Sequence, residues 1–228
     1  MTTGFFWKKI ILYICTVLGI AVAVISFLSM GVTGKSTVLE TQKNFYFLVS
    51  TSSHIQASTH NAQYLGGAGY TLAYGDRDYV TYAVYTDVSS GEQAYQSLKQ
   101  QDKDVLLITL RAKNLRFVTE KDKQSASAYK SAFECLYAHI RLLNKEIARL
   151  DDGATQESTK RFLKIQRRQF LYMQRQYEKV FSEFSSVCKQ AVEQIEEMQS
   201  QIVYVKDMRY LSCFLCQSYA LLAENVQL

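Results

Sequence analysis

The sequence predicts an α+β protein in three parts: a transmembrane helix at residues 10–34, a small α/β module at 44–112 and a helical region at 113–228. Three observations predict this order. The first part has no charged residue, the second alternates between strand-like and helix-like patterns, and the third repeats its apolar residues with a period of 3.5. The chain of 228 residues also contains no proline, although about 5% is usual, so long helices meet few forced breaks.

The apolar segment at residues 10–34 is predicted to cross a membrane once. At about 1.5 Å per residue it is long enough for a hydrocarbon core about 30 Å thick. The aromatic residues 5–7 precede Lys8 and Lys9, an arrangement typical of a membrane interface next to the cytoplasm. The alternative is a cleaved signal peptide, but its apolar core is usually shorter, roughly 7–15 residues.

This orientation defines the expected location of the chain. Residues 1–9 would be cytoplasmic, residues 35–43 would form a polar tether, and residues 35–228 would lie outside the cytoplasm. We therefore expect a single-pass cell-membrane protein that contacts the lipid bilayer through residues 10–34.

The α/β module is predicted to have the order βαββαβ, the split-βαβ arrangement. Aromatic and β-branched runs predict the strands, and apolar residues at helical spacing predict the helices. The predicted elements are strand 44–50, helix 55–65, strand 70–74, strand 79–85, helix 90–100 and strand 105–110. We expect the two helices to cover one face of a four-stranded sheet and to leave the other face open.

Several segments of this module follow the pattern of a known family. They are Tyr46-Phe-Leu-Val-Ser50, Asn61-Ala62, Gly69-Tyr70, Tyr79-Val-Thr-Tyr-Ala-Val-Tyr85 and Glu92-Gln-Ala94. In these segments residues 44–112 resemble the SPOR domain of bacterial envelope proteins. The resemblance implies that the open sheet face binds the glycan strands of peptidoglycan, particularly strands without stem peptides, in cell division or sporulation.

The candidate glycan-binding residues follow from strand alternation. Tyr46, Leu48 and Ser50 are expected on one face of the first strand, and Tyr79, Thr81 and Ala83, with Tyr85, on one face of the third. Aromatic rings can stack on sugars while nearby polar groups bind their hydroxyls. The alternative is that the tyrosines only pack a half-buried sheet, because aromatic residues favour strands in general.

The helical region contains two apolar seams and a third apolar stripe. The first seam ends where residues 151–154 break the chain, and the second, if it is unbroken, predicts one helix from about residue 157 to 200. Together they predict an antiparallel helical hairpin, either self-contained or part of a coiled-coil homodimer. The C-terminal helix is expected either to pack back on this hairpin or to continue it. The seams are Tyr129, Phe133, Leu136, Ile140, Leu143, Ile147 and Leu150, then Leu163, Phe170, Tyr177, Phe184, Ala191 and Met198; the stripe is Leu211, Leu215, Tyr219 and Leu222.

Two further motifs have competing interpretations. Cys213 and Cys216 form a CxxC motif, but they lie in an apolar helical stripe and are better explained as buried small residues than as a redox or zinc site. Residues 160–168 contain five cations, either a solvated helix face or a patch for anionic head groups or cell-wall polymers. We expect no catalytic residues, metal or cofactor, and the dispersed net charge of +5 does not indicate nucleic-acid binding.

The sequence therefore favours a non-enzymatic, membrane-anchored envelope protein. Its SPOR-like module would bind peptidoglycan glycan strands, and its helical module would self-associate or dock an envelope protein. The alternative is a membrane-tethered helical scaffold whose α/β module is structural and binds no glycan. The two differ in whether residues 113–228 cover the second sheet face.

Overall fold

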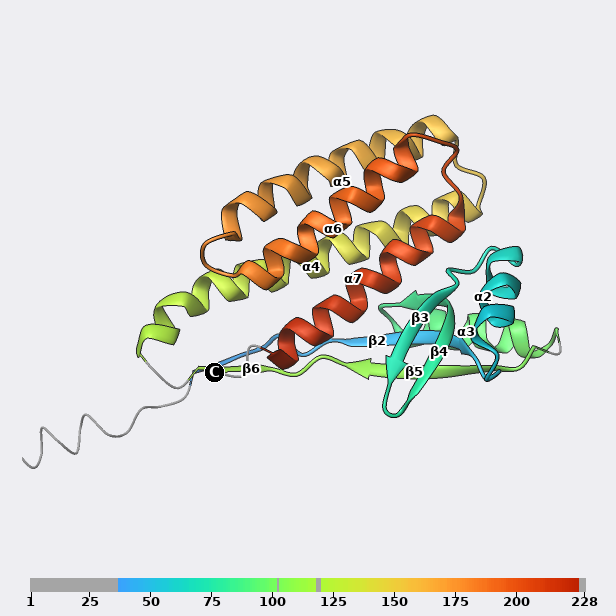
Figure 1. The fold of residues 1–228 in the computed structure, drawn as a ribbon, viewed down its shortest axis with the longest axis horizontal. Coiled ribbons are helices and arrows are strands. Elements are labelled where there is room, and N and C mark those ends of the chain that lie inside the picture. Colours follow the sequence, from blue (N-terminus) through green and yellow to red (C-terminus); the bar gives the residue numbers. More distant parts are fainter. Residues whose placement is uncertain (1–36, 102, 118–119, 226–228) are drawn as a thin grey trace, which may run out of the picture.

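The structure, a computed structural model, describes residues 37–101, 103–117 and 120–225. Its centre is a four-stranded antiparallel sheet with two short helices on one face and a four-helix bundle on the other (Figure 1). The α+β class and the order of elements in the α/β module are thus as predicted.

The sheet has the strand order β3-β4-β2-β5. Helices α2 and α3 pack on one of its faces, around a small core that contains Leu48, Val80 and Tyr82. A two-residue turn at Gly75 (φ +62°) and Asp76 joins β3 to β4, so β4 begins at Arg77, two residues earlier than the predicted strand 79–85. The elements are β2 Asn44–Ser50, α2 Ile55–Tyr64, β3 Tyr70–Tyr74, β4 Arg77–Tyr85, α3 Val88–Lys99 and β5 Val105–Arg111.

The second face of the sheet is not open, which corrects the prediction. Helix α7 (Val205–Asn225) lies across β3, β4 and β5, and α4 (Glu120–Asp151) packs beside it (Figure 1). Phe45, Phe47 and Val49 of β2 are fully buried and belong to the same hydrophobic cluster as the bundle. The α/β module and the helical region therefore share one core.

The bundle contains α4, α5 (Gln156–Tyr177), α6 (Ser182–Gln199) and α7, each antiparallel to the next. The predicted single helix from 157 to 200 is wrong, because the chain reverses between Tyr177 and Ser182. The amides of Val180 and Phe181 both donate to the carbonyl of Tyr177, and Phe181 is buried. The hairpin predicted from two helices is therefore a bundle of four.

The predicted seams form the inside of this bundle. Residues of both seams are buried or half-buried, and the α7 stripe is buried as well. Met173, Val180 and Val187 lie midway between successive residues of the second seam; Met173 is buried, Val187 is half-buried, and Val180 is exposed (46%) because it lies in the α5–α6 turn. A heptad pattern indicates which residues face the core. Here the seven-residue spacing continues from α5 into α6 although the chain reverses direction between them.

The predicted tether at 35–43 is partly structured. Strand β1 (Thr37–Leu39) pairs with β6 (Leu115–Phe117), and the Thr41 hydroxyl donates to the Lys113 carbonyl at 2.8 Å while accepting from the Leu115 amide at 3.1 Å. Residues 39–43 are thereby fixed to the segment that leads into α4.

The predicted transmembrane segment at 10–34 and the cytoplasmic residues 1–9 lie outside the described residues. Within the described ranges, none of the helices is both long and apolar enough to cross a membrane.

Candidate functional site

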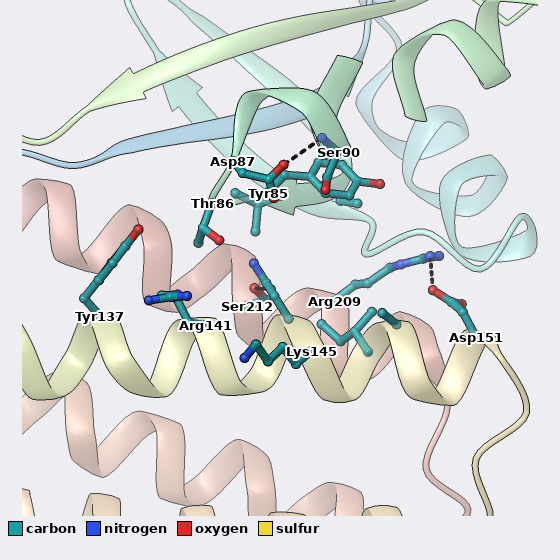
Figure 2. A pocket seen from close by; sticks show the side chains of 15 residues that line it. Tyr85, Thr86, Asp87, Ser90, Tyr137, Arg141, Lys145, Asp151, Arg209 and Ser212 are labelled. Atoms are coloured by element: carbon teal, nitrogen blue, oxygen red, sulfur yellow. Dashed lines mark hydrogen bonds and ion pairs between the residues drawn. The ribbon is translucent and has the colours of Figure 1, made fainter. Parts of the chain in front are cut away.

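A pocket lies where the end of β4 and the start of α3 meet α4 and α7. We call it the β4–α4 groove; its volume is about 470 Å³ (Figure 2). Strand β4 extends beyond its pairing with β3 at Thr81, which leaves its last residues free to line the groove. The lining residues are Ala83, Val84, Tyr85, Thr86, Asp87, Ser90, Tyr137, Arg141, Asn144, Lys145, Ile147, Ala148, Asp151, Arg209 and Ser212.

Asp87 lies on the sheet side of the groove and is the N-cap of α3. Its carboxylate accepts from the Ser90 amide at 2.8 Å and from the Ser89 hydroxyl at 3.0 Å. The Ser90 amide bond is the main cause of the lowered pKa of Asp87. Asp87 therefore carries a negative charge at neutral pH, at a fixed position on the groove rim.

Arg209 closes one end of the groove. Its guanidinium donates to the Asp151 carboxylate at 2.8 Å and to the Gly66 carbonyl at 2.7 Å. These bonds join α7 to the end of α4 and to the turn before β3. At this end the positive charge is already paired.

The α4 side of the groove contributes cations without such a pairing. Arg141 and Lys145 are four residues apart, so they share a helix face; both are exposed, and neither forms an ion pair with the residues that the structure describes. Figure 2 shows Tyr137 and Arg141 on α4 facing Thr86 and Asp87 across the groove.

Two tyrosines contribute aromatic surface and hydroxyl groups. Burial is the main cause of the raised pKa values of Tyr85 and Tyr137, and the nearby cations Arg209 and Arg141 partly offset it. Both hydroxyls are therefore protonated at neutral pH. The Nζ atom of Lys43 lies 4.9 Å from the centre of the Tyr137 ring, which fixes that ring at the edge of the groove.

The floor of the groove contains one unsatisfied polar atom. The Ser212 hydroxyl donates to Oδ1 of Asn144 at 2.5 Å, while Nδ2 of Asn144 is buried and has no acceptor in the structure. The groove thus combines both charge signs, two tyrosines and an amide. These groups can hold a polar ligand through hydrogen bonds and ion pairs.

The six residues predicted to bind glycan do not share one surface. A bulge between Leu48 and Val49 pairs Leu48 with Ala83 and Val49 with Thr81. Since directly paired residues lie on the same face, Ala83 joins Leu48 on the α2–α3 face, whereas Thr81 joins Val49 on the bundle face. The predicted alternation along 79–85 is therefore wrong at residue 82, the extra residue of the bulge.

The remaining predicted residues are covered as well. Tyr46 lies under Gly91 of α3, where an added Cβ would come within 3.2 Å of the Tyr46 Cβ, and Tyr79 packs against the bundle cluster. Ser50 is buried on the Tyr46 face, and Thr81 is fully buried with its hydroxyl unpaired. None of the six forms part of an open sheet face; Ala83 alone lines the β4–α4 groove.

Cys213 and Cys216 are both fully buried in α7, as expected for small core residues. Burial is the main cause of the raised pKa values of both thiols. Within the described part of the chain, no three His, Cys, Asp or Glu residues are close enough to hold a metal ion.

The groove could not be recognised from the sequence because its residues come from three separate segments, 83–90, 137–151 and 209–212. One signal was available in the sequence: Arg141 and Lys145 are two cations four residues apart on α4, outside its apolar seam. Comparisons of the chain with protein-family models, curated proteins and solved structures found no match.

Proposed function

We propose that the chain is a non-enzymatic scaffold, anchored in the cell membrane through residues 10–34, that docks a partner protein of the cell envelope in the β4–α4 groove. Residues 35–228 would lie outside the cytoplasm. The observation that carries this proposal is the covered sheet: α2 and α3 fill one face, and α7 and α4 fill the other. A glycan strand has no sheet face to enter.

The groove supports the docking part of the proposal. Tyrosine and arginine are enriched at the energetic centres of protein interfaces, and the groove presents Tyr85, Tyr137 and Arg141 together. Asp87 opposite Arg141 gives the groove opposite charges on its two walls, which would select the orientation of a polar polypeptide segment.

The second candidate function is glycan binding, as the SPOR-like pattern implies. The observation in its favour is that two tyrosines and several polar groups meet in the groove, where a sugar ring could stack. Its site would then differ from the sheet face that the family resemblance implies.

The two functions are distinguished by sedimentation of the full-length, detergent-solubilised chain with peptidoglycan sacculi, with and without amidase treatment that removes stem peptides. The scaffold proposal predicts no retention in either preparation. Retention enhanced by amidase would contradict it. Loss of that retention in Tyr46→Ala and Tyr79→Ala would assign binding to the sheet, and loss in Tyr85→Ala and Tyr137→Ala would assign it to the groove.

The docking part is tested by a photo-crosslinking residue placed at Thr86 in cells that make the protein. We expect an adduct with an envelope protein that disappears when Arg141→Ala is added. As a control, the same crosslinking residue is placed at Gln96, which is exposed on α3 and does not line the groove. This position should give no such adduct. An adduct that forms equally from both positions, or that persists without Arg141, would contradict docking in the groove.

A further inference from the structure

Helix α5 carries a row of exposed residues along the side opposite its core. We call this row the outer stripe of α5; it consists of Arg161, Lys164, Ile165, Arg168, Tyr172 and Arg175. Their spacing of three and four residues places them on one helix face. The buried residues of α5, which include Leu163 and Phe170, lie on the opposite face.

The charges of the outer stripe are largely unneutralised. The only acidic residue in α5 is Glu157, which pairs with Arg161. Lys164, Arg168 and Arg175 form no ion pair with any residue in the described ranges. By contrast Arg167, which faces α6, pairs with Glu196. Three of the four cations of the outer stripe are therefore available to a partner outside the protein, whereas Arg161 and Arg167 are paired.

Two large apolar side chains lie among these cations. Ile165 is 56% exposed and Tyr172 is 63% exposed, and they are seven residues apart on the same face. A single exposed apolar residue needs no explanation. Apolar and aromatic side chains flanked by lysine and arginine on one helix face, however, match a helix that lies in a membrane interface.

We propose that the outer stripe of α5 binds the surface of an anionic lipid bilayer. The cations would contact lipid phosphates, while Ile165 and Tyr172 would enter the headgroup region. One argument rests on the proposed membrane anchor: β1 begins at Thr37, and three residues beyond position 34 span at most about 10 Å. The folded body is thereby held next to the bilayer.

The test places a fluorescent reporter on the stripe of the full-length chain. Trp7→Phe removes the single native tryptophan, and Tyr172→Trp places one in the stripe. This protein is reconstituted in vesicles whose phosphatidylcholine has brominated acyl chains, with and without anionic phosphatidylglycerol. We expect the indole fluorescence to be quenched in anionic vesicles and this quenching to be lost at high salt. In neutral vesicles, the indole emission should be close to the emission measured with lipid that carries no bromine.

The charge dependence is tested with two triple variants in the same background. Lys164→Gln, Arg168→Gln and Arg175→Gln should reduce quenching in anionic vesicles to the neutral-vesicle level. Lys99→Gln, Lys130→Gln and Lys189→Gln remove the same charge from exposed positions on other helices and should leave quenching unchanged. Far-UV circular dichroism verifies that both remain folded.

Three results would overturn the proposal: equal quenching in neutral and anionic vesicles, no quenching in either, or equal loss in both triple variants. A response of the indole to soluble dextran sulfate, without quenching in anionic vesicles, would assign the stripe to an anionic polymer and would also overturn it. Resistance of the protein to alkaline extraction from the vesicles reports on the anchor separately, so failure of the anchor and failure of the stripe can be distinguished.

Discussion

Tyr219 is the residue at which the sheet, the bundle and the N-terminal segment meet. Its ring contacts Phe45 of β2 and Phe133 of α4 edge-on, with centroid distances of 5.4 and 4.9 Å. Its hydroxyl donates to the Thr41 carbonyl at 2.9 Å. Burial is the main cause of the raised pKa of Tyr219, so the hydroxyl remains a donor at neutral pH.

Removing parts of Tyr219 should therefore destabilise the whole fold. We expect Tyr219→Phe to lower the free energy of unfolding by about 1 kcal/mol, because the Thr41 carbonyl loses its donor, and Tyr219→Ala to lower it by about 3–5 kcal/mol. Urea denaturation measures both. Tyr64→Phe, at an 85% exposed position, is the control; an equally small effect of Tyr219→Ala would contradict the shared core.

The two cysteines of the CxxC motif, Cys213 and Cys216, should be unreactive in the folded protein. Because the raised pKa values of Cys213 and Cys216 leave both thiols protonated, iodoacetamide at pH 8 should modify neither in the native protein and both in denaturant. Mass spectrometry of the 205–225 region reads out the modification. Rapid native labelling would show that the thiols are accessible and would reopen a redox function.

At the scale of the elements, a histidine links α4 to α5. His139 Nδ1 lies 2.7 Å from Gln166 Oε1, and the imidazole packs on Phe170 at 5.2 Å. Burial is the main cause of its lowered pKa; the bond to Gln166 acts in the opposite direction. Histidines in the unfolded chain have a pKa of about 6.5. As the pH falls, His139 is therefore protonated at a higher pH in the unfolded chain than in the folded protein.

The sign of the pH dependence follows. The stabilisation by neutral His139 should be complete above about pH 6.5 and decrease below it, by at most about 1.4 kcal/mol per pH unit. Urea denaturation between pH 7.5 and about 5 should show a shallower decrease for His139→Gln than for the wild type. His60→Gln, at an exposed position, should keep the wild-type slope; equal slopes in all three proteins would contradict the prediction.

The reversal between α5 and α6 depends on Phe181. This side chain is 2% exposed and packs on Tyr129, Phe133 and Phe184. Phe181→Ala should lower the free energy of unfolding by about 3–5 kcal/mol, and Val180→Ala, at the exposed neighbour, by well under half of that. Comparable effects in urea denaturation would indicate that α5 and α6 continue as one helix.

The elements could be predicted where local patterns decide them. The strands and helices of 44–112 and the inward-facing residues of the bundle follow from short-range periodicity. The α5–α6 reversal could not be predicted from such patterns, because it contains neither proline nor glycine and depends on a distant contact of Phe181 with α4. The bulge at Leu48 also depends on cross-strand register, which alternation alone does not give.

At the scale of the whole molecule, the covered sheet had a signal in the sequence. Residues 45–49 are apolar without interruption, a pattern typical of a strand that is buried on both faces. That run indicated a second layer of helices, and it argued against an open binding face. The β4–α4 groove, by contrast, exists only after α4 and α7 have packed on the sheet, so only single residues of it could be recognised beforehand.

The α/β module and the bundle form one body with a common core. Hydrogen exchange of the full-length chain in increasing urea tests this most directly, with peptides from β2, β4, α4 and α7 followed separately. We predict that the slowest-exchanging amides of all four elements converge on one free energy of opening and one urea dependence. If β2 and β4 stay protected after α7 has exchanged completely, the sheet is stable without its helical cover, and the two parts do not form one body.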